Sequence, residues 1–137
     1  MSFNRIIAYE ISQLAPATAW EQVPDELMSG YTLINVGCSA DKASKDNPWR
    51  ILLAAAKPED YVIVKLDIDT SSIELPLIQQ ILENSTISQL IDEMFFEHHV
   101  TVKEMIRYWG HPPGSLNDSY QYFIKLRQLG IRMHAWP

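Results

Sequence analysis

The sequence is poor in cysteine and has no long hydrophobic run. Its single cysteine, Cys38, cannot form a disulfide within the chain, which agrees with a reducing compartment. No apolar run reaches the length of a membrane span, and the first residues lack the form of a signal peptide. We therefore expect a soluble, cytoplasmic protein without a membrane partner.

Positive charge and glycine are also scarce. The chain has 11 Lys and Arg against 17 Asp and Glu, which gives a formal net charge of −6 at pH 7. Nucleic-acid binding needs a basic stripe that neutralises phosphates, so we expect no nucleic-acid partner. The five glycines are dispersed, and no Gly-x-Gly-x-x-Gly phosphate-binding pattern occurs. A small-molecule substrate and a second copy of the chain are both compatible with this composition.

What the sequence does contain is a set of short apolar runs separated by helical signals. Hydrophobic residues make up 47% of the chain, which is enough for a core, and residues 1–137 suit a single domain. The first three runs are apolar on both faces, as in a parallel sheet that is covered on both sides. The predicted strands are 5–9, 31–36, 61–66, 93–97 and 131–136.

Capping patterns and apolar stripes predict helices between these strands. They lie at Thr18-x-x-Glu21, Asn47-Pro48, the stripe from Ile73 to Leu82, Thr101-x-x-Glu104 and Ser115-x-x-Asp118. Alternating strands and helices are typical of βαβ units. We therefore predict an α/β fold of three-layer, Rossmann-like form, with a mostly parallel sheet of about five strands and helices on both faces.

Polar side chains, most of them acidic or imidazole, follow the predicted strands, at the sheet edge where such folds bind ligands. In chain order these residues are Glu10, Ser39, Asp41, Asp67, Asp69, Glu97, His98 and His99. Asp67 and Asp69 are two residues apart, so they point to the same side of an extended chain, as does Lys65. Adjacent histidines on a strand point to opposite faces, and we expect His99 to share a face with Glu97.

Three interpretations of these strand ends remain open. In the first, Glu10 binds the ribose hydroxyls of a nucleoside cofactor. In the second, Asp67, Asp69, Glu97 and His99 bind a divalent metal ion, because mixed carboxylate and imidazole ligands suit Mn, Fe or Zn. In the third, polar residues only carry each strand into water. The third is weak for the whole set, because several like charges brought together without a partner cost energy.

Three stretches of the sequence resemble consecutive parts of class I S-adenosylmethionine-dependent methyltransferases, and the FkbM-type group in particular. They read RIIAYEI, LINVGCSADKAS and YVIVKLDIDTSSIE, within residues 5–83. In that group an acidic residue follows an aromatic residue at a strand end, as in Tyr9-Glu10. A later strand reads Lys-apolar-Asp-apolar-acid, as residues 65–69 do, and a helix with an early glutamate follows, which Glu74 matches.

The resemblance implies a Rossmann-like sheet that binds S-adenosylmethionine. Glu10 would bind the cofactor ribose, and the segment that contains Ser39 and Asp41 would lie near the adenine. Asp67 would sit beside the methionine end of the cofactor or the substrate. The family's Gly-rich loop, however, should precede residues 5–9 by about 20 residues. It is missing, so the chain is expected to be N-terminally truncated relative to the family. Either strands 5–9 and 61–66 then pair directly, or a second copy of the chain covers the open strand edges.

The leading interpretation is a truncated methyltransferase-like protein of unknown acceptor, which either retains methyl transfer or has lost it. Its catalytic residues are Asp67, Glu97 and His99, and no metal is assigned. Substrate-binding residues are Lys65, Asp69 and His98, although an ion pair between Lys65 and Asp67 is the favoured role for the lysine. Two alternatives belong to other classes: a non-catalytic binding or homo-oligomerisation module, and a metal-dependent hydrolase that uses the acidic and histidine cluster.

Overall fold

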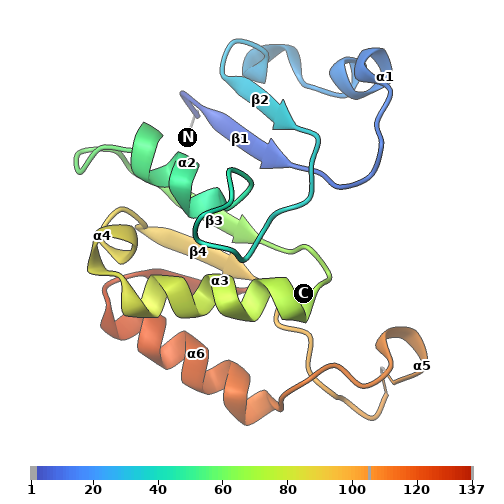
Figure 1. Cartoon of the computed structure of the whole chain (residues 1–137), viewed down its shortest axis with the longest axis vertical. Coiled ribbons are helices and arrows are strands. Elements are labelled where there is room, and N and C mark those ends of the chain that lie inside the picture. Colours follow the sequence, from blue (N-terminus) through green and yellow to red (C-terminus); the bar gives the residue numbers. More distant parts are fainter. Residues whose placement is uncertain (1–2, 105, 137) are drawn as a thin grey trace. The chain divides into compact units, whose positions relative to one another are not determined.

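The computed structural model describes residues 3–104 and 106–136, and it shows an α/β protein with five parallel strands (Figure 1). The strands are β1 (Ile6–Tyr9), β2 (Tyr31–Ile34), β3 (Ile63–Leu66), β4 (Glu93–Phe96) and β5 (Arg132–Ala135). Each falls inside a predicted segment, which confirms the expected fold class. Hydrogen bonding divides them between a two-stranded sheet, β1–β2, and a three-stranded sheet, β3–β4–β5.

The described chain forms two compact units, of which one ends at Pro48 and the other begins at Trp49. The first unit contains β1, α1 (Pro16–Glu21), the 3-10 helix η1 (Asp25–Leu27) and β2. Gly30 directly precedes β2 and lies against the segment that leads into β1. A Cβ added at Gly30 would lie 2.6 Å from the Asn4 carbonyl oxygen. A glycine is therefore required where the two strands begin to pair.

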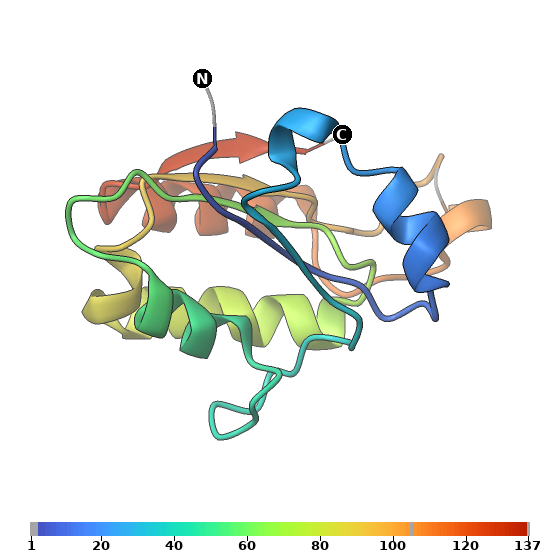
Figure 2. The same ribbon diagram turned by 90° about the horizontal axis from the view of Figure 1, so that it is seen from above.

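The second unit contains the three-stranded sheet and most of the helices. These are α3 (Ser71–Glu83), α4 (Ser85–Ser88), α5 (Ile106–Trp109) and α6 (Leu116–Gln128), while α2 (Pro48–Ala55) begins at the boundary between the units. In Figure 1, α3 and α6 run next to each other, and Figure 2 shows α3 below the strands of this sheet. Among the described residues, no helix is both long and apolar enough to cross a membrane.

One face of the three-stranded sheet forms the hydrophobic core with α3 and α6. Every second strand residue points to this face, as strand geometry requires. The buried side chains of this core include Leu66, Met94, Phe96 and Met133 from the sheet and Leu77, Ile78, Ile81 and Leu126 from the helices. The predicted apolar stripe of the helix at Ile73–Leu82 is thereby confirmed, and its burial holds the helix on the sheet.

The opposite face of this sheet carries a polar and aromatic ladder. Lys65, Phe95 and His134 are paired across the three strands in register. The rings of Phe95 and His134 stack with centroids 4.6 Å apart, and the Lys65 Nζ lies 4.3 Å from the centre of the Trp136 ring. The Lys65 side chain is thus held against this face of the sheet, one residue before the end of β3.

Two predicted helix starts agree with the structure. Pro48 is the first residue of α2, where its fixed φ angle and missing N–H do no harm. Ser115 caps α6 in a reciprocal capping box: its hydroxyl accepts the Asp118 N–H, and the Asp118 carboxylate accepts the Ser115 N–H at 2.7 Å. Both helices therefore begin where local side-chain chemistry predicts.

Two other predicted starts are wrong. The first helix begins at Pro16 rather than after a Thr18 cap, because proline is favoured in a first turn. Residues 101–104 are not helical, and α5 is described from Ile106; Met105 lies outside the described residues. The Thr101 hydroxyl donates to the Pro112 carbonyl at 2.8 Å.

The core predicts a large difference between two neighbouring positions of α3. Ile81 is fully buried, so Ile81→Ala should lower the free energy of unfolding by about 2–5 kcal/mol through lost contacts and a cavity. Gln79 is exposed, and its side chain donates to Glu83 in the next turn, so Gln79→Ala should change the free energy of unfolding by about 0.5 kcal/mol or less. Urea unfolding followed by circular dichroism measures both, and equal effects would contradict the core assignment.

Candidate functional site

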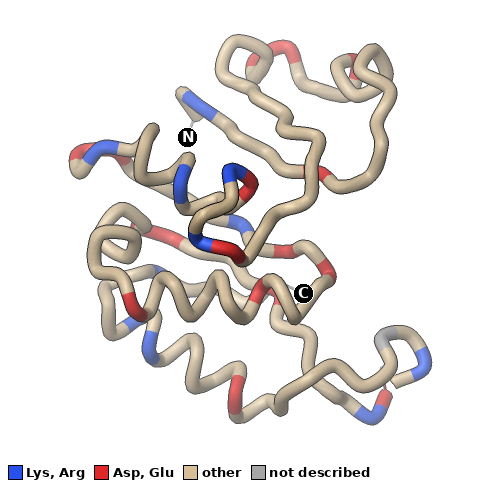
Figure 3. Tube along the Cα trace, viewed as in Figure 1, with Lys and Arg blue, Asp and Glu red and all other residues tan. Residues whose placement is uncertain are grey.

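The candidate site lies where the neighbouring strands β3 and β4 end. Their parallel register pairs Leu66 with Phe96, and the Glu97 N–H continues the ladder by donating to the Leu66 carbonyl at 3.2 Å. The segments that follow β3 and β4 therefore leave the sheet side by side. Asp67 and Asp69 follow on one chain and Glu97 on the other, and Figure 3 shows acidic positions along the turn that follows β3. The second unit alone supplies all of these residues.

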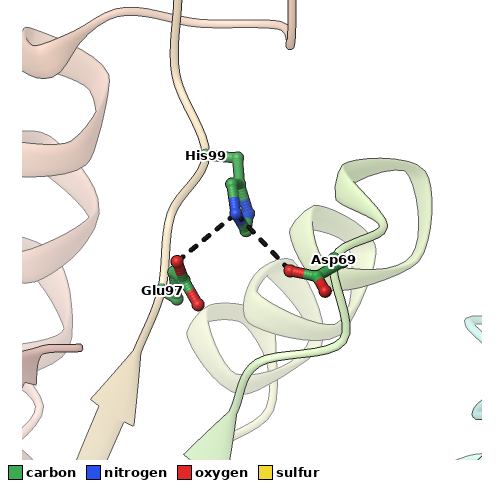
Figure 4. A group of neighbouring side chains, drawn as sticks. All are labelled: Asp69, Glu97 and His99. Carbon is green, nitrogen blue, oxygen red and sulfur yellow. Dashed lines mark ion pairs between the residues drawn. The ribbon is translucent and has the colours of Figure 1, made fainter. Parts of the chain in front are cut away.

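Asp69, Glu97 and His99 converge at this point (Figure 4). The Nε2 of His99 is 3.5 Å from Asp69 Oδ1 and 3.4 Å from Glu97 Oε1, and the imidazole points between the two carboxylates. One ligand atom from each residue lies within 4.8 Å of the others. The side chain of His99 is 9% exposed and that of Asp69 is 82% exposed, so the cluster reaches from the interior to solvent.

The backbone at Asp69 is strained. Its φ angle is +54°, in the left-handed region, which costs energy for a residue with a side chain, although Asp tolerates it better than most. Just before it, the Ile68 N–H donates to the Glu74 carboxylate at 3.0 Å. Local strain of this kind persists only where the surrounding structure holds it, and it is found often at functional sites.

Asp67 and Glu97 form a carboxyl pair beside the cluster. The hydrogen bond with Glu97 and the ion pair with Lys65, whose Nζ is 2.6 Å from Asp67 Oδ2, lower the pKa of Asp67. The Asp67 carboxylate and burial together raise the pKa of Glu97 to about 7. At neutral pH the pair therefore holds a proton on Glu97 for part of the time, while Asp67 remains ionised.

His98 points away from this cluster and packs against α6. Its Nδ1 is 2.7 Å from the Ser119 hydroxyl, and its ring stacks on Phe96 and meets the edge of Tyr122. Burial lowers the pKa of His98. The expectation that His99, rather than its neighbour, shares a face with Glu97 is thus confirmed. A role of His98 in substrate binding stays a prediction.

The residues predicted to bind a nucleoside cofactor lie in the first unit, where they bond to their own turns. The Glu10 carboxylate accepts the Ser12 N–H at 2.6 Å, and this bond lowers the pKa of Glu10. The Ser39 hydroxyl accepts the Asp41 N–H at 3.1 Å, and Asp41 in turn accepts the Ala43 N–H at 2.9 Å. Cofactor binding by these residues stays a prediction.

Sequence reasoning missed Glu74 as a neighbour of the site. Its side chain is 1% exposed, burial raises its pKa, and the charges of His99, Asp69 and Asp67 act on it. The signal was present in the sequence. The buried residues Leu77, Ile78 and Ile81 follow Glu74 by three, four and seven residues, so the acid lies on the apolar stripe of α3.

A pocket of about 330 Å³ opens beside the cluster. It is lined by Asp69, Ser71, His99, Tyr108 and Pro112. The volume is at the lower end of the range found for small-molecule sites. Two residues of the cluster therefore face a space that a small molecule can enter.

Comparison of the chain with protein-family models, with curated proteins and with solved structures found no match. The function must therefore be inferred from the chemistry of the site.

The carboxyl pair predicts an unusual pH dependence of stability in the absence of metal. The pKa of Glu97 is raised from 4.5 to about 7 on folding, so in this interval the folded chain binds more protons than the unfolded chain. Stability should therefore fall as the pH rises through this interval. Glu97→Gln removes this contribution, so the melting temperature of the variant should fall less than that of the wild type between roughly pH 5 and pH 8.

Thermal unfolding in the presence of a chelator measures this difference. The lowered pKa of His98 acts in the opposite direction, since it favours the folded chain as the pH rises towards 6.5, but it is common to both proteins. Glu59→Gln, at an exposed acid before β3, is the matched control and should follow the wild type. Parallel wild-type and Glu97→Gln curves would show that the carboxyl pair does not share a proton.

Proposed function

We propose that the protein binds one divalent metal ion between Asp69, Glu97 and His99 and uses it to hydrolyse a small-molecule substrate. The spacing of the ligand atoms carries this proposal. Ligands that lie about 2.0–2.2 Å from one metal ion, at tetrahedral or octahedral angles, are about 2.8–3.6 Å apart. The two distances from His99 Nε2 to the carboxylate oxygens, 3.5 and 3.4 Å, fall in this range.

The ligand types favour a transition metal ion over calcium. Two carboxylates balance the charge of a divalent cation, and an imidazole ligand suits Mn, Fe or Zn. Three protein ligands leave coordination positions for water or substrate, as in catalytic sites. Because Asp69 is exposed, these positions are accessible to solvent. A metal-bound water has a lowered pKa and becomes a nucleophile near neutral pH.

Asp67 supports the hydrolytic role. It lies next to the ligand set, and Lys65 keeps it ionised, so it can accept a hydrogen bond from the nucleophilic water and orient it. Glu97 gives up its own proton when it becomes a ligand. The neighbouring pocket, lined by Asp69 and His99, then offers the space in which a substrate would meet the bound water.

Added metal should stabilise the folded protein. A ligand that binds only the folded state at 100 times its Kd stabilises it by about 2.7 kcal/mol, so Mn²⁺ or Zn²⁺ should raise the melting temperature by several degrees. His99→Ala should abolish the rise, and Glu59→Gln, an exposed acid at the other end of β3, should retain it. Scanning calorimetry with metal and with chelator measures the effect. A wild-type melting temperature unchanged by Mn²⁺, Zn²⁺ and Mg²⁺ would exclude the metal site.

Methyl transfer is the second candidate function, and one observation favours it. Glu10 follows a parallel strand directly, and its pKa is lowered, so it offers an ionised carboxylate of the kind that binds ribose hydroxyls. In this interpretation S-adenosylmethionine is the cofactor and the methyl acceptor is unknown.

Calorimetric titration with S-adenosylhomocysteine separates the two candidates. If methyl transfer is the function, the wild type should bind with micromolar affinity in the presence of chelator. Glu10→Gln should weaken binding about 10-fold or more, because an amide accepts fewer hydrogen bonds from the ribose. Asp41→Asn serves as a comparison in the segment predicted to lie near the adenine. Absence of heat with the wild type would exclude cofactor binding and leave the metal-dependent hydrolase as the remaining candidate function.

A further inference from the structure

We propose that Glu74 is the positioning residue of this site: its buried carboxylate holds the turn that carries Asp69 and supplies negative charge that favours a bound cation. This inference rests on the proposed metal site, and it adds a residue that touches neither the metal ion nor the substrate. Glu74 lies on the first turn of α3 and is 1% exposed. Such a carboxylate needs a reason to be buried, because desolvation of a charged group costs energy.

One hydrogen bond joins Glu74 to the turn that carries Asp69. Glu74 Oε1 accepts the N–H of Ile68 at 3.0 Å, and Ile68 is the residue between Asp67 and Asp69. This bond joins α3 to the turn that follows β3. It holds the turn at Ile68, immediately before Asp69 with its strained φ angle of +54°. A bond to a carboxylate is stronger than a bond between neutral groups. Glu74 therefore holds the backbone from which the exposed Asp69 side chain reaches His99.

Charged groups of the site also act on Glu74. They come from His99, Asp69 and Asp67, two of which are ligands in the proposed site. A carboxylate outside the ligand set orients the ligands and stabilises the metal ion, and its loss typically weakens metal binding about 10–100-fold. Asp67 and Asp69 repel the Glu74 carboxylate, and a bound cation would offset this repulsion.

A purely structural role for Glu74 makes a different prediction. An acid in the first turn of a helix stabilises that helix by interacting with its dipole, and a buried hydrogen bond stabilises the turn. In that case substitution would lower stability and leave the affinity and geometry of a bound metal ion unchanged. Metal affinity, together with the coordination geometry, therefore distinguishes the two roles.

Two substitutions separate the hydrogen bond from the charge. Glu74→Gln keeps nearly the same volume and an oxygen that can accept the Ile68 N–H, but it removes the charge. Glu74→Ala removes both. Gln80→Met, at a position of the same helix that is 5% exposed, is the control for general destabilisation. The measurements are calorimetric titration with Mn²⁺ and the visible absorption of the Co²⁺ complex, which reports the number and arrangement of ligands.

We expect Glu74→Gln to bind Mn²⁺ about 10-fold or more weakly, with a Co²⁺ spectrum like that of the wild type. Glu74→Ala should bind more weakly still and change the spectrum, because Asp69 is no longer held. If the alanine variant does not fold, Glu74→Gln alone decides the charge effect. Folded Glu74→Gln with wild-type Mn²⁺ affinity would overturn the charge effect, and folded Glu74→Ala with a wild-type Co²⁺ spectrum would overturn the positioning role. Either result would leave the metal site intact. A wild type that binds neither ion would overturn the proposed function itself.

Discussion

The parallel pairing of β3 and β4 is the constraint on which the candidate site depends. Leu66 and Phe96 are opposite each other in the register, and both are buried. A shift of one residue would exchange the two faces of a strand and move apolar side chains out of the core. The core therefore fixes the register, and the register brings the carboxylates of Asp67 and Glu97 together where the strands end.

Like charges at this point need compensation, and the structure contains two forms of it. Lys65 pairs with Asp67 and is itself held over Trp136, while a proton shared by the carboxyl pair reduces the charge on Glu97. The proposed divalent cation would be a third form, and the arrangement of Asp69, Glu97 and His99 favours it. His99 reaches Asp69 and Glu97 only at 3.5 and 3.4 Å, distances that are long for hydrogen bonds and suitable for ligands that share an ion.

Much of this arrangement could be predicted from the sequence, because it follows from local patterns. Apolar runs located the five strands, and the two-residue period of a strand placed His99 with Glu97. The division into two sheets could not be predicted in this way, since strand pairing joins residues far apart in the chain. The capping pattern at residues 101–104 was misleading for a similar reason: these residues belong to a loop, in which Thr101 bonds to Pro112, eleven residues further along the chain. Glu74 was missed because its burial follows from helical phase, which was considered only for apolar residues.

The most direct test of the metal-site account is anomalous diffraction from a crystal of the protein grown with Mn²⁺, recorded on both sides of the manganese absorption edge. The account predicts one strong anomalous peak at about 2.0–2.3 Å from oxygens of Asp69 and Glu97 and from His99 Nε2. Well-ordered side chains at this place without an anomalous peak, or a peak bound only elsewhere, would contradict it.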